Sequence, residues 1–140
     1  MTQTTIFGPM LMMMVLTLVV WVYMYVRRIR FLNSVDIPPN ELTALRLAEI
    51  SPPEVANPSD NLKNLFEMPV LFYAVAIYLY VVGQVDGINL VAAWVFVVFR
   101  VMHSAVHCTV NIVMLRFGIY AVSSLALWFM VVRAGIEFYD

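Results

Sequence analysis

Apolar residues dominate the chain in four long runs, which short polar stretches separate. The runs cover about residues 7–26, 59–82, 89–113 and 117–136. Each run has roughly the 20 residues that an α-helix needs to cross the hydrocarbon core of a bilayer. We therefore predict an all-α membrane protein in which residues 1–140 form a single membrane domain, a four-transmembrane-helix up-down bundle.

The second run contains its own helix signals. It begins at Asn57-Pro58-Ser59-Asp60, and such short polar residues with a proline favour a helix N-terminus. Pro69 lies inside the run and has no N–H to donate to the carbonyl of Leu65. We expect a kink there, which would open room for a polar site near Glu67.

Composition supports a lipid environment and excludes other classes. Hydrophobic residues make up 63% of the chain and charged residues only 12%, a balance that a soluble domain of this size cannot bury. The net charge of −1 and the lack of a dense basic patch predict no nucleic-acid partner. The single cysteine, Cys108, rules out a disulfide within the chain and is expected to pack as a small apolar residue.

The distribution of basic residues predicts the orientation. Lys and Arg gather on one side of the membrane, and only Arg133, which we expect to snorkel, falls on the other side. The basic side carries Arg27, Arg28, Arg30, Arg46, Lys63 and Arg116. Cytoplasmic segments are enriched in such residues, so the loop at about residues 31–56 should be cytoplasmic, and both termini non-cytoplasmic, in a multi-pass protein of the bacterial inner membrane. Within this loop, Asn40 to Ile50 suits a short interfacial helix.

The third run carries polar residues at helical spacing. These residues are Arg100, His103, Ser104, His107 and Asn111. Their spacing places them on one face of a helix, and ionisable groups within a membrane are too costly to face lipid. At 1.5 Å per residue they extend from near the bilayer centre to the cytoplasmic surface. The second and fourth runs bring further polar groups to that level, namely Lys63, Asn64, Glu67, Arg116, Tyr120, Ser123 and Ser124.

Two interpretations of this cluster need no bound anion. In the first, Glu67 neutralises Arg100 or Arg116, and the histidines and asparagines hydrogen-bond between helices. In the second, His103 and His107 bind a metal ion together with Glu67. The nearby Arg100 would repel a cation, so we predict no metal site.

A third interpretation is a site for an anion or a thiolate. Arg116 lies where the fourth helix begins, and free N–H groups at a helix N-terminus also favour negative charge. A thiol bound there would have its pKa lowered from about 8.5, which yields the nucleophilic thiolate at neutral pH. Tyr120, one turn further on, would donate a hydrogen bond to the sulfur or to a developing oxyanion.

Three motifs in this order resemble the MAPEG family, the membrane-associated proteins in eicosanoid and glutathione metabolism. They are Asn64-Leu65-Phe66-Glu67 with Pro69, then Arg100-x-x-His103, then Arg116-x-x-x-Tyr120. The likeness covers all four runs, and the stretch NLFEMPVLFYA is similar to the bacterial branch of the family.

The resemblance implies a homotrimer with glutathione bound between neighbouring subunits, in the cytoplasmic half of the bilayer. Glutathione would be the co-substrate, and the reaction would be conjugation to a lipophilic electrophile or reduction of a hydroperoxide. Arg116 and Tyr120 would be catalytic, with the thiolate stabilised by Arg116. The tripeptide would be held by Lys63, Asn64, Glu67, Arg100, His103 and His107.

The chain also departs from the family pattern. Better-known members are richer in arginine just before the Asn-x-x-Glu motif, whereas this chain has Asp60, Asn61 and Lys63, and lysine cannot form a bidentate fork to a carboxylate. His107 stands where several members have tyrosine. These differences predict that glutathione affinity is weakened or abolished. They leave open a non-catalytic membrane scaffold, a lipid-binding protein, or an accessory subunit of a larger membrane complex.

Overall fold

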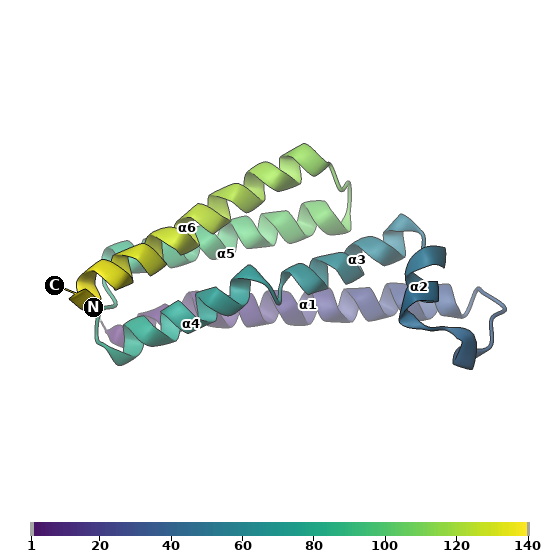
Figure 1. Ribbon diagram of the computed structural model, residues 1–140, viewed down its shortest axis with the longest axis horizontal. Helices are drawn as coiled ribbons and strands as arrows, with labels where there is room; N and C mark the ends of the chain where they lie inside the picture. Colours follow the sequence, from purple (N-terminus) through teal and green to yellow (C-terminus); the bar gives the residue numbers. More distant parts are fainter. Residues whose placement is uncertain (1, 140) are drawn as a thin grey trace.

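Four long helical segments run side by side along the length of the molecule (Figure 1). The computed structural model describes residues 2–139, and no β-strand occurs within that range. The first segment is α1 (Phe7–Leu32), the second is split into α3 (Pro53–Asn64) and α4 (Met68–Val81), and the others are α5 (Gly87–Cys108) and α6 (Val113–Tyr139). Short elements complete the chain, namely the 3-10 helices η1 (Gln3–Ile6) and η2 (Pro39–Glu41) and the helix α2 (Ala44–Ile50).

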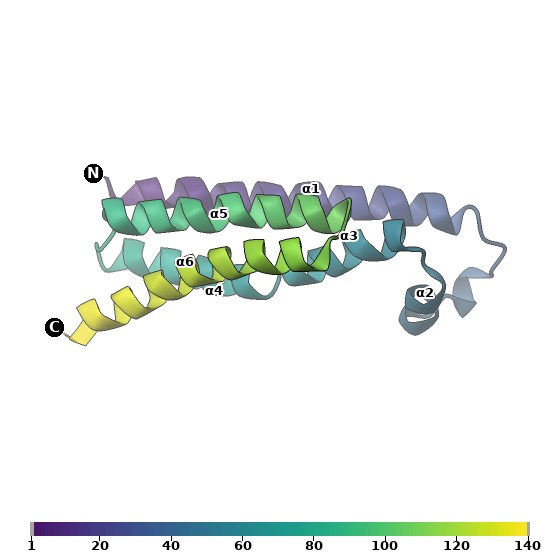
Figure 2. The same cartoon turned by 90° about the horizontal axis from the view of Figure 1, so that it is seen from above.

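Both chain termini lie at one end of the bundle, and α2 lies at the other (Figures 1 and 2). We call these the terminal end and the loop end. The structure has four segments long and apolar enough to cross a membrane, 22 to 30 residues each. The prediction of an all-α bundle with four membrane-spanning segments is therefore confirmed.

The outer surface is apolar, as a lipid solvent requires. Leu18, Val91 and Leu125 are examples of large side chains that are more than half exposed, on three different segments. Inside the bundle, the rings of Phe72 and Phe96 stack with their centroids 4.5 Å apart. Helices α5 and α6 pack along each other, as do α1 and α3.

The second segment is interrupted rather than merely kinked. Helix α3 ends at Asn64 and α4 begins at Met68, with Glu67 in a non-helical conformation between them (φ −98°, ψ −102°). Pro69 is the cause that the sequence supplies, because it withholds the hydrogen bond that the carbonyl of Leu65 needs. Figure 1 shows a short non-helical loop between α3 and α4 near the middle of the bundle.

The turn between the last two helices is longer than the predicted boundaries allowed. Helix α5 ends at Cys108, not near 113, and α6 begins at Val113, so Asn111 lies in the turn rather than on the polar face of α5. Asn111 has a positive φ of 46°, a left-handed conformation that asparagine adopts more readily than most residues. Its backbone N–H closes the turn by donating to the carbonyl of Val106 at 2.8 Å.

The terminal end is held by polar contacts between residues far apart in the sequence. Arg133 donates to both carboxylate oxygens of Asp86, at 2.8 and 2.6 Å, and pairs with Glu137 at 2.9 Å. Asp86 also caps α5 by accepting from the backbone N–H of Asn89. The expected snorkelling of Arg133 is accompanied by an ion pair with Asp86, which lies 47 residues away in the sequence.

The loop end contains a shorter helix than expected. Instead of one helix over Asn40 to Ile50, the structure has the turn η2 followed by α2. Thr43 caps α2 by accepting a hydrogen bond from the backbone N–H of Arg46. The helix begins at Ala44 because the residue before it, Thr43, supplies the N-terminal cap.

Candidate functional site

A pocket of about 240 Å³ lies between three helices in the loop-end half of the bundle. Asn64 at the end of α3, His103 on α5, and Arg116 and Tyr120 on α6 line it. Val113 and Phe117 complete the wall. The fold therefore brings four of the predicted site residues, from distant parts of the chain, to one cavity.

Arg116 is held in place by two asparagines. Its Nη1 donates to the side-chain oxygen of Asn111 at 2.6 Å. The amide nitrogen of Asn111 in turn donates to the side-chain oxygen of Asn57 at 3.1 Å. This chain of hydrogen bonds ties the start of α6 to α3 and restricts the guanidinium that faces the pocket.

Arg100 is the largest fully buried side chain among the described residues. Its Nη2 donates to the backbone carbonyl of Asn64 at 3.0 Å, and its guanidinium lies over the ring of Tyr120, 5.6 Å from the centroid. Its Nε and Nη1 are buried without a hydrogen-bond partner in the part of the chain that the structure describes. A buried cation with unused donors is costly, so this site favours an anionic group from outside the protomer.

The two histidines of α5 lie beside the pocket, and His103 also lines it. His103 and His107 are almost fully buried, and their rings are 5.6 Å apart. His103 is also 5.9 Å from the ring of Tyr120. No group of three or more His, Cys, Asp or Glu side chains within residues 2–139 is arranged to hold a metal ion. Within the protomer, Glu67 therefore does not complete a ligand set with these histidines.

Two predicted site residues point elsewhere. Lys63 pairs with Asp60 at 3.0 Å, and both side chains are mostly exposed. Glu67 is exposed in the break between α3 and α4 and forms no ion pair with Arg100 or Arg116 among the pairs found in residues 2–139. Residues 2–139 therefore show no direct ion pair between Glu67 and a buried arginine. The break accounts for this, because helical spacing cannot be extended across residues 65–67.

The comparison with known proteins fits this architecture. A model of the MAPEG family matches residues 6–136, nearly the whole chain. The chain belongs to the MAPEG family. This family includes glutathione-dependent enzymes, and four membrane-spanning helices are consistent with its fold. No curated protein and no solved structure matches the chain.

Sequence reasoning missed one buried residue of this MAPEG protein. Asn61 is fully buried, accepts a hydrogen bond from Ser104 at 3.3 Å, and donates to the sulfur of Cys108 at 3.5 Å. Its place before the Asn-x-x-Glu motif marks only a departure from the family pattern. The signal was the spacing of Asn57, Asn61 and Asn64, which puts three amides on one face of α3. That face packs against α5 and the turn that follows it, so the three asparagines form a continuous polar seam.

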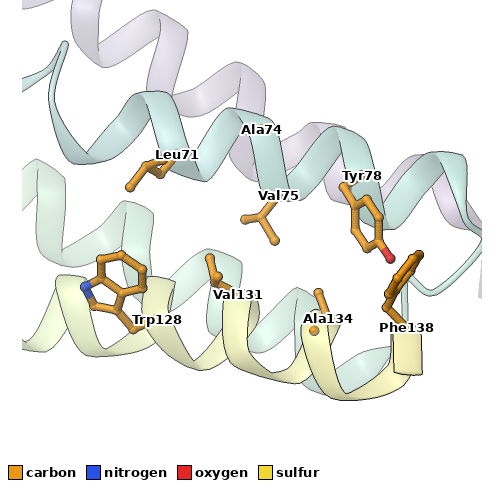
Figure 3. Close-up of a pocket in the computed structure, with 9 residues that line it drawn as sticks. Leu71, Ala74, Val75, Tyr78, Trp128, Val131, Ala134 and Phe138 are labelled. Atoms are coloured by element: carbon orange, nitrogen blue, oxygen red, sulfur yellow. The ribbon is translucent and has the colours of Figure 1, made fainter. Parts of the chain in front are cut away.

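An apolar groove of about 470 Å³ lies between α4 and α6, toward the terminal end. Figure 3 shows Leu71, Val75 and Tyr78 facing Trp128 and Phe138 across it. The groove begins about one helical turn beyond Glu67, and Trp128 lies about 12 Å along α6 from Tyr120. The groove of this MAPEG protein therefore lies about two helical turns from the polar pocket along α6.

Proposed function

We propose that this protein is a glutathione-dependent transferase or peroxidase that acts on lipophilic electrophiles. The observation that carries the proposal is the pocket shared by Asn64, His103, Arg116 and Tyr120, with the unpaired donors of Arg100 beside it. Glutathione supplies the anionic groups that these basic side chains lack within the protomer. It has two carboxylates for the guanidinium groups and a thiol that a nearby cation converts to thiolate.

The binding residues would be divided between subunits. Asn64 and His103 line the pocket within one protomer. Arg100 bonds the carbonyl of Asn64, and His107 packs against His103. Glu67 is exposed on the surface, where a neighbouring copy would lie in a homotrimer. We assign its carboxylate to the α-amino group of a glutathione molecule held between two copies. Lys63 lies outside this pocket, so its predicted contact with glutathione would also require a neighbouring copy.

The chemistry needs few protein groups. Arg116 stabilises the thiolate, whose sulfur attacks the electrophilic carbon and forms a thioether. Tyr120 donates a hydrogen bond to the oxyanion that develops when an epoxide or an enone is the electrophile. With a hydroperoxide, the sulfur attacks the O–O bond to give an alcohol and a glutathione sulfenic acid. A second glutathione then reduces that product to the disulfide and water.

The apolar groove supports a lipophilic partner for this reaction. The groove has an apolar wall and opens at the outer surface of the protomer, so we propose that a substrate enters it from the bilayer and does not cross water. We place the substrate's apolar part against Trp128 and its reactive carbon near Tyr120. The enrichment of Lys and Arg at the loop end supports a bacterial inner-membrane location with that end cytoplasmic.

Isothermal titration of the detergent-purified protein with glutathione tests the binding step. We expect heat at millimolar ligand or below. We also expect a loss of ultraviolet thiolate absorbance in Arg116→Ala but not in Arg46→Ala, which removes an exposed arginine of the same loop end. No heat at millimolar glutathione would favour the alternative, a non-catalytic scaffold, a lipid-binding protein or an accessory subunit. Co-purification of unrelated chains would favour the accessory subunit.

A further inference from the structure

Ser124 lies between the polar pocket and the apolar groove on α6. Tyr120 lines the pocket, and Trp128 lines the groove (Figure 3). Ser124 is four residues from each of them, so the three side chains occupy successive turns of one helix face, about 6 Å apart along the axis. A molecule that extends along this face from the groove to the pocket has to pass Ser124.

The hydroxyl of Ser124 has no hydrogen-bond partner in its own chain. Its Oγ is buried and makes no hydrogen bond within residues 2–139. A serine inside a helix commonly donates to the carbonyl one turn back, which here is that of Tyr120. Ser123 Oγ already donates to that carbonyl at 2.8 Å. A buried hydroxyl without a partner is unfavourable, so Ser124 favours an acceptor that a ligand brings.

Rotation of the side chain makes this hydroxyl available to a ligand. Ser124 as a residue is only partly buried, although its Oγ is enclosed. A serine hydroxyl has three staggered positions about a single bond, and no hydrogen bond fixes it here among residues 2–139. The hydroxyl can therefore turn toward a bound molecule without a shift of the backbone.

We infer that Ser124 is a specificity-determining residue, which selects electrophiles that carry an oxygen on the reacting carbon. This role rests on the proposed function, in which the reacting carbon lies near Tyr120 and the apolar part of the substrate lies against Trp128. When an epoxide opens, the thiolate forms a bond to carbon, the C–O bond breaks, and its electron pair stays on oxygen. Tyr120 and Ser124 each donate a hydrogen bond to that oxygen, which then takes a proton from water.

An alkyl iodide provides the contrasting substrate. The thiolate displaces iodide from its carbon, so the C–I bond breaks and no oxygen anion develops. A long-chain terminal epoxide and a terminal iodide of the same chain length offer the groove the same apolar surface. They differ in the atom that Ser124 would contact.

Turnover of these two substrates by Ser124→Ala tests the specificity role. We expect kcat/KM for the epoxide to fall about tenfold, as loss of a hydrogen bond to a developing charge implies. The value for the iodide and the KM for glutathione should stay unchanged, because Ser124 does not line the polar pocket. Ser123→Ala is the matched control, since it removes the same hydroxyl from the adjacent residue, where the carbonyl of Tyr120 already accepts it. This control should keep the wild-type preference.

An infrared measurement tests the contact without turnover. A long-chain ketone with a ¹³C-labelled carbonyl is added to the detergent-purified full chain in the absence of glutathione. A hydrogen bond weakens the carbonyl bond, so we expect the band of the bound ketone at lower frequency in the wild-type protein and in Ser123→Ala than in Ser124→Ala.

Three results would overturn the inference. Equal losses for the epoxide and the iodide in Ser124→Ala would mean a packing role. Equal losses in Ser123→Ala and Ser124→Ala would mean a general effect on α6. Identical carbonyl bands in the wild-type protein and Ser124→Ala would show that Ser124 contacts no ligand oxygen. If neither substrate is turned over but the bands differ as expected, the proposed enzymatic activity fails, and the contact between Ser124 and a ligand oxygen stands.

Discussion

Arg116 and Asn111 are joined by a hydrogen bond of 2.6 Å across the turn that precedes α6. Asn111 has a left-handed backbone conformation with φ of 46°. Glycine adopts that conformation without strain. The side chain that orients the guanidinium can therefore be removed while the backbone of the turn is preserved.

We expect Asn111→Gly to lower glutathione-dependent turnover about tenfold, since a hydrogen bond to a charged group contributes roughly 1.5 kcal/mol or more. The pKa of the bound glutathione thiol should rise, because the guanidinium is no longer held in place. Turnover and thiolate absorbance measured against pH provide the check. Thr109→Ala is the matched control, since Thr109 lies in the same turn, is exposed, and bonds only the carbonyl of Ala105. An Asn111→Gly profile that matches this control would contradict the positioning role.

Arg100 should be needed for ligand binding and not for folding. Replacement by methionine fills a similar volume and removes a buried cation whose Nε and Nη1 have no partner. We expect Arg100→Met to leave the thermal unfolding temperature unchanged or raised, because removal of an incompletely satisfied buried charge is often neutral or stabilising. Glutathione affinity should fall at least about tenfold. A large loss of stability with unchanged affinity would instead assign Arg100 a purely structural role.

The Asp86 and Arg133 pair should make stability depend on acid pH. Its hydrogen bonds from Arg133 lower the pKa of Asp86 from 3.8 to about 2. A lowered pKa stabilises the fold above the unfolded-state value and loses that effect as pH falls toward about 2. We expect the unfolding temperature of the wild-type protein to fall between about pH 4 and pH 2 more steeply than that of Asp86→Asn.

At neutral pH, Asp86→Asn keeps a side chain that can cap α5 but loses the ion pair, which is partly exposed. The expected cost is at most about 1 kcal/mol. Thermal unfolding in detergent followed by circular dichroism measures both quantities. Parallel pH dependences in the two proteins would show that Asp86 does not carry the effect.

If the site is shared between two copies of the chain, two inactive variants should restore activity when they assemble together. Glu67→Ala and Arg116→Ala should each be inactive alone, because each removes one side of every shared site. Trimers assembled from a mixture of the two variants would contain interfaces in which both residues are intact, so part of the activity should return. Co-expression with two different affinity tags, followed by purification through both, supplies the mixed assemblies. If mixing restores nothing, Glu67 and Arg116 do not act across one interface.

The sequence predicted four spans because each is a long apolar run with few charges. Its helix start at Asn57 to Asp60 was wrong, since α3 begins at Pro53 and Pro58 lies inside it. It also identified Asn64, His103, Arg116 and Tyr120, which one pocket brings together. Buried polar side chains on α5, such as Arg100 and Ser104, were predictable since lipid cannot solvate them.

Other features depend on partners that spacing along one helix cannot reveal. The position of Asn111 was predicted wrongly because a helix was extended through it, whereas the chain turns at that point. Helical spacing could not predict where the Glu67 side chain points, because the helix is interrupted at the break before Pro69. Arg133 meets Asp86 only through packing of α6 against the start of α5. Periodicity assigns a face within one element, and tertiary contacts decide what that face meets.

The division of the second span into α3 and α4 gives this span a point at which it can bend. A continuous helix that is too long for a thinner bilayer commonly adapts by tilting as a whole. Here the span can flex at residues 65–67, where the helical hydrogen bonding is already interrupted. The backbone carbonyl of Asn64, which accepts a hydrogen bond from Arg100, lies next to this break. We therefore expect turnover to vary with lipid chain length in reconstituted vesicles, and constant turnover would refute this. The proline break would then make the reaction responsive to the thickness of the membrane around it.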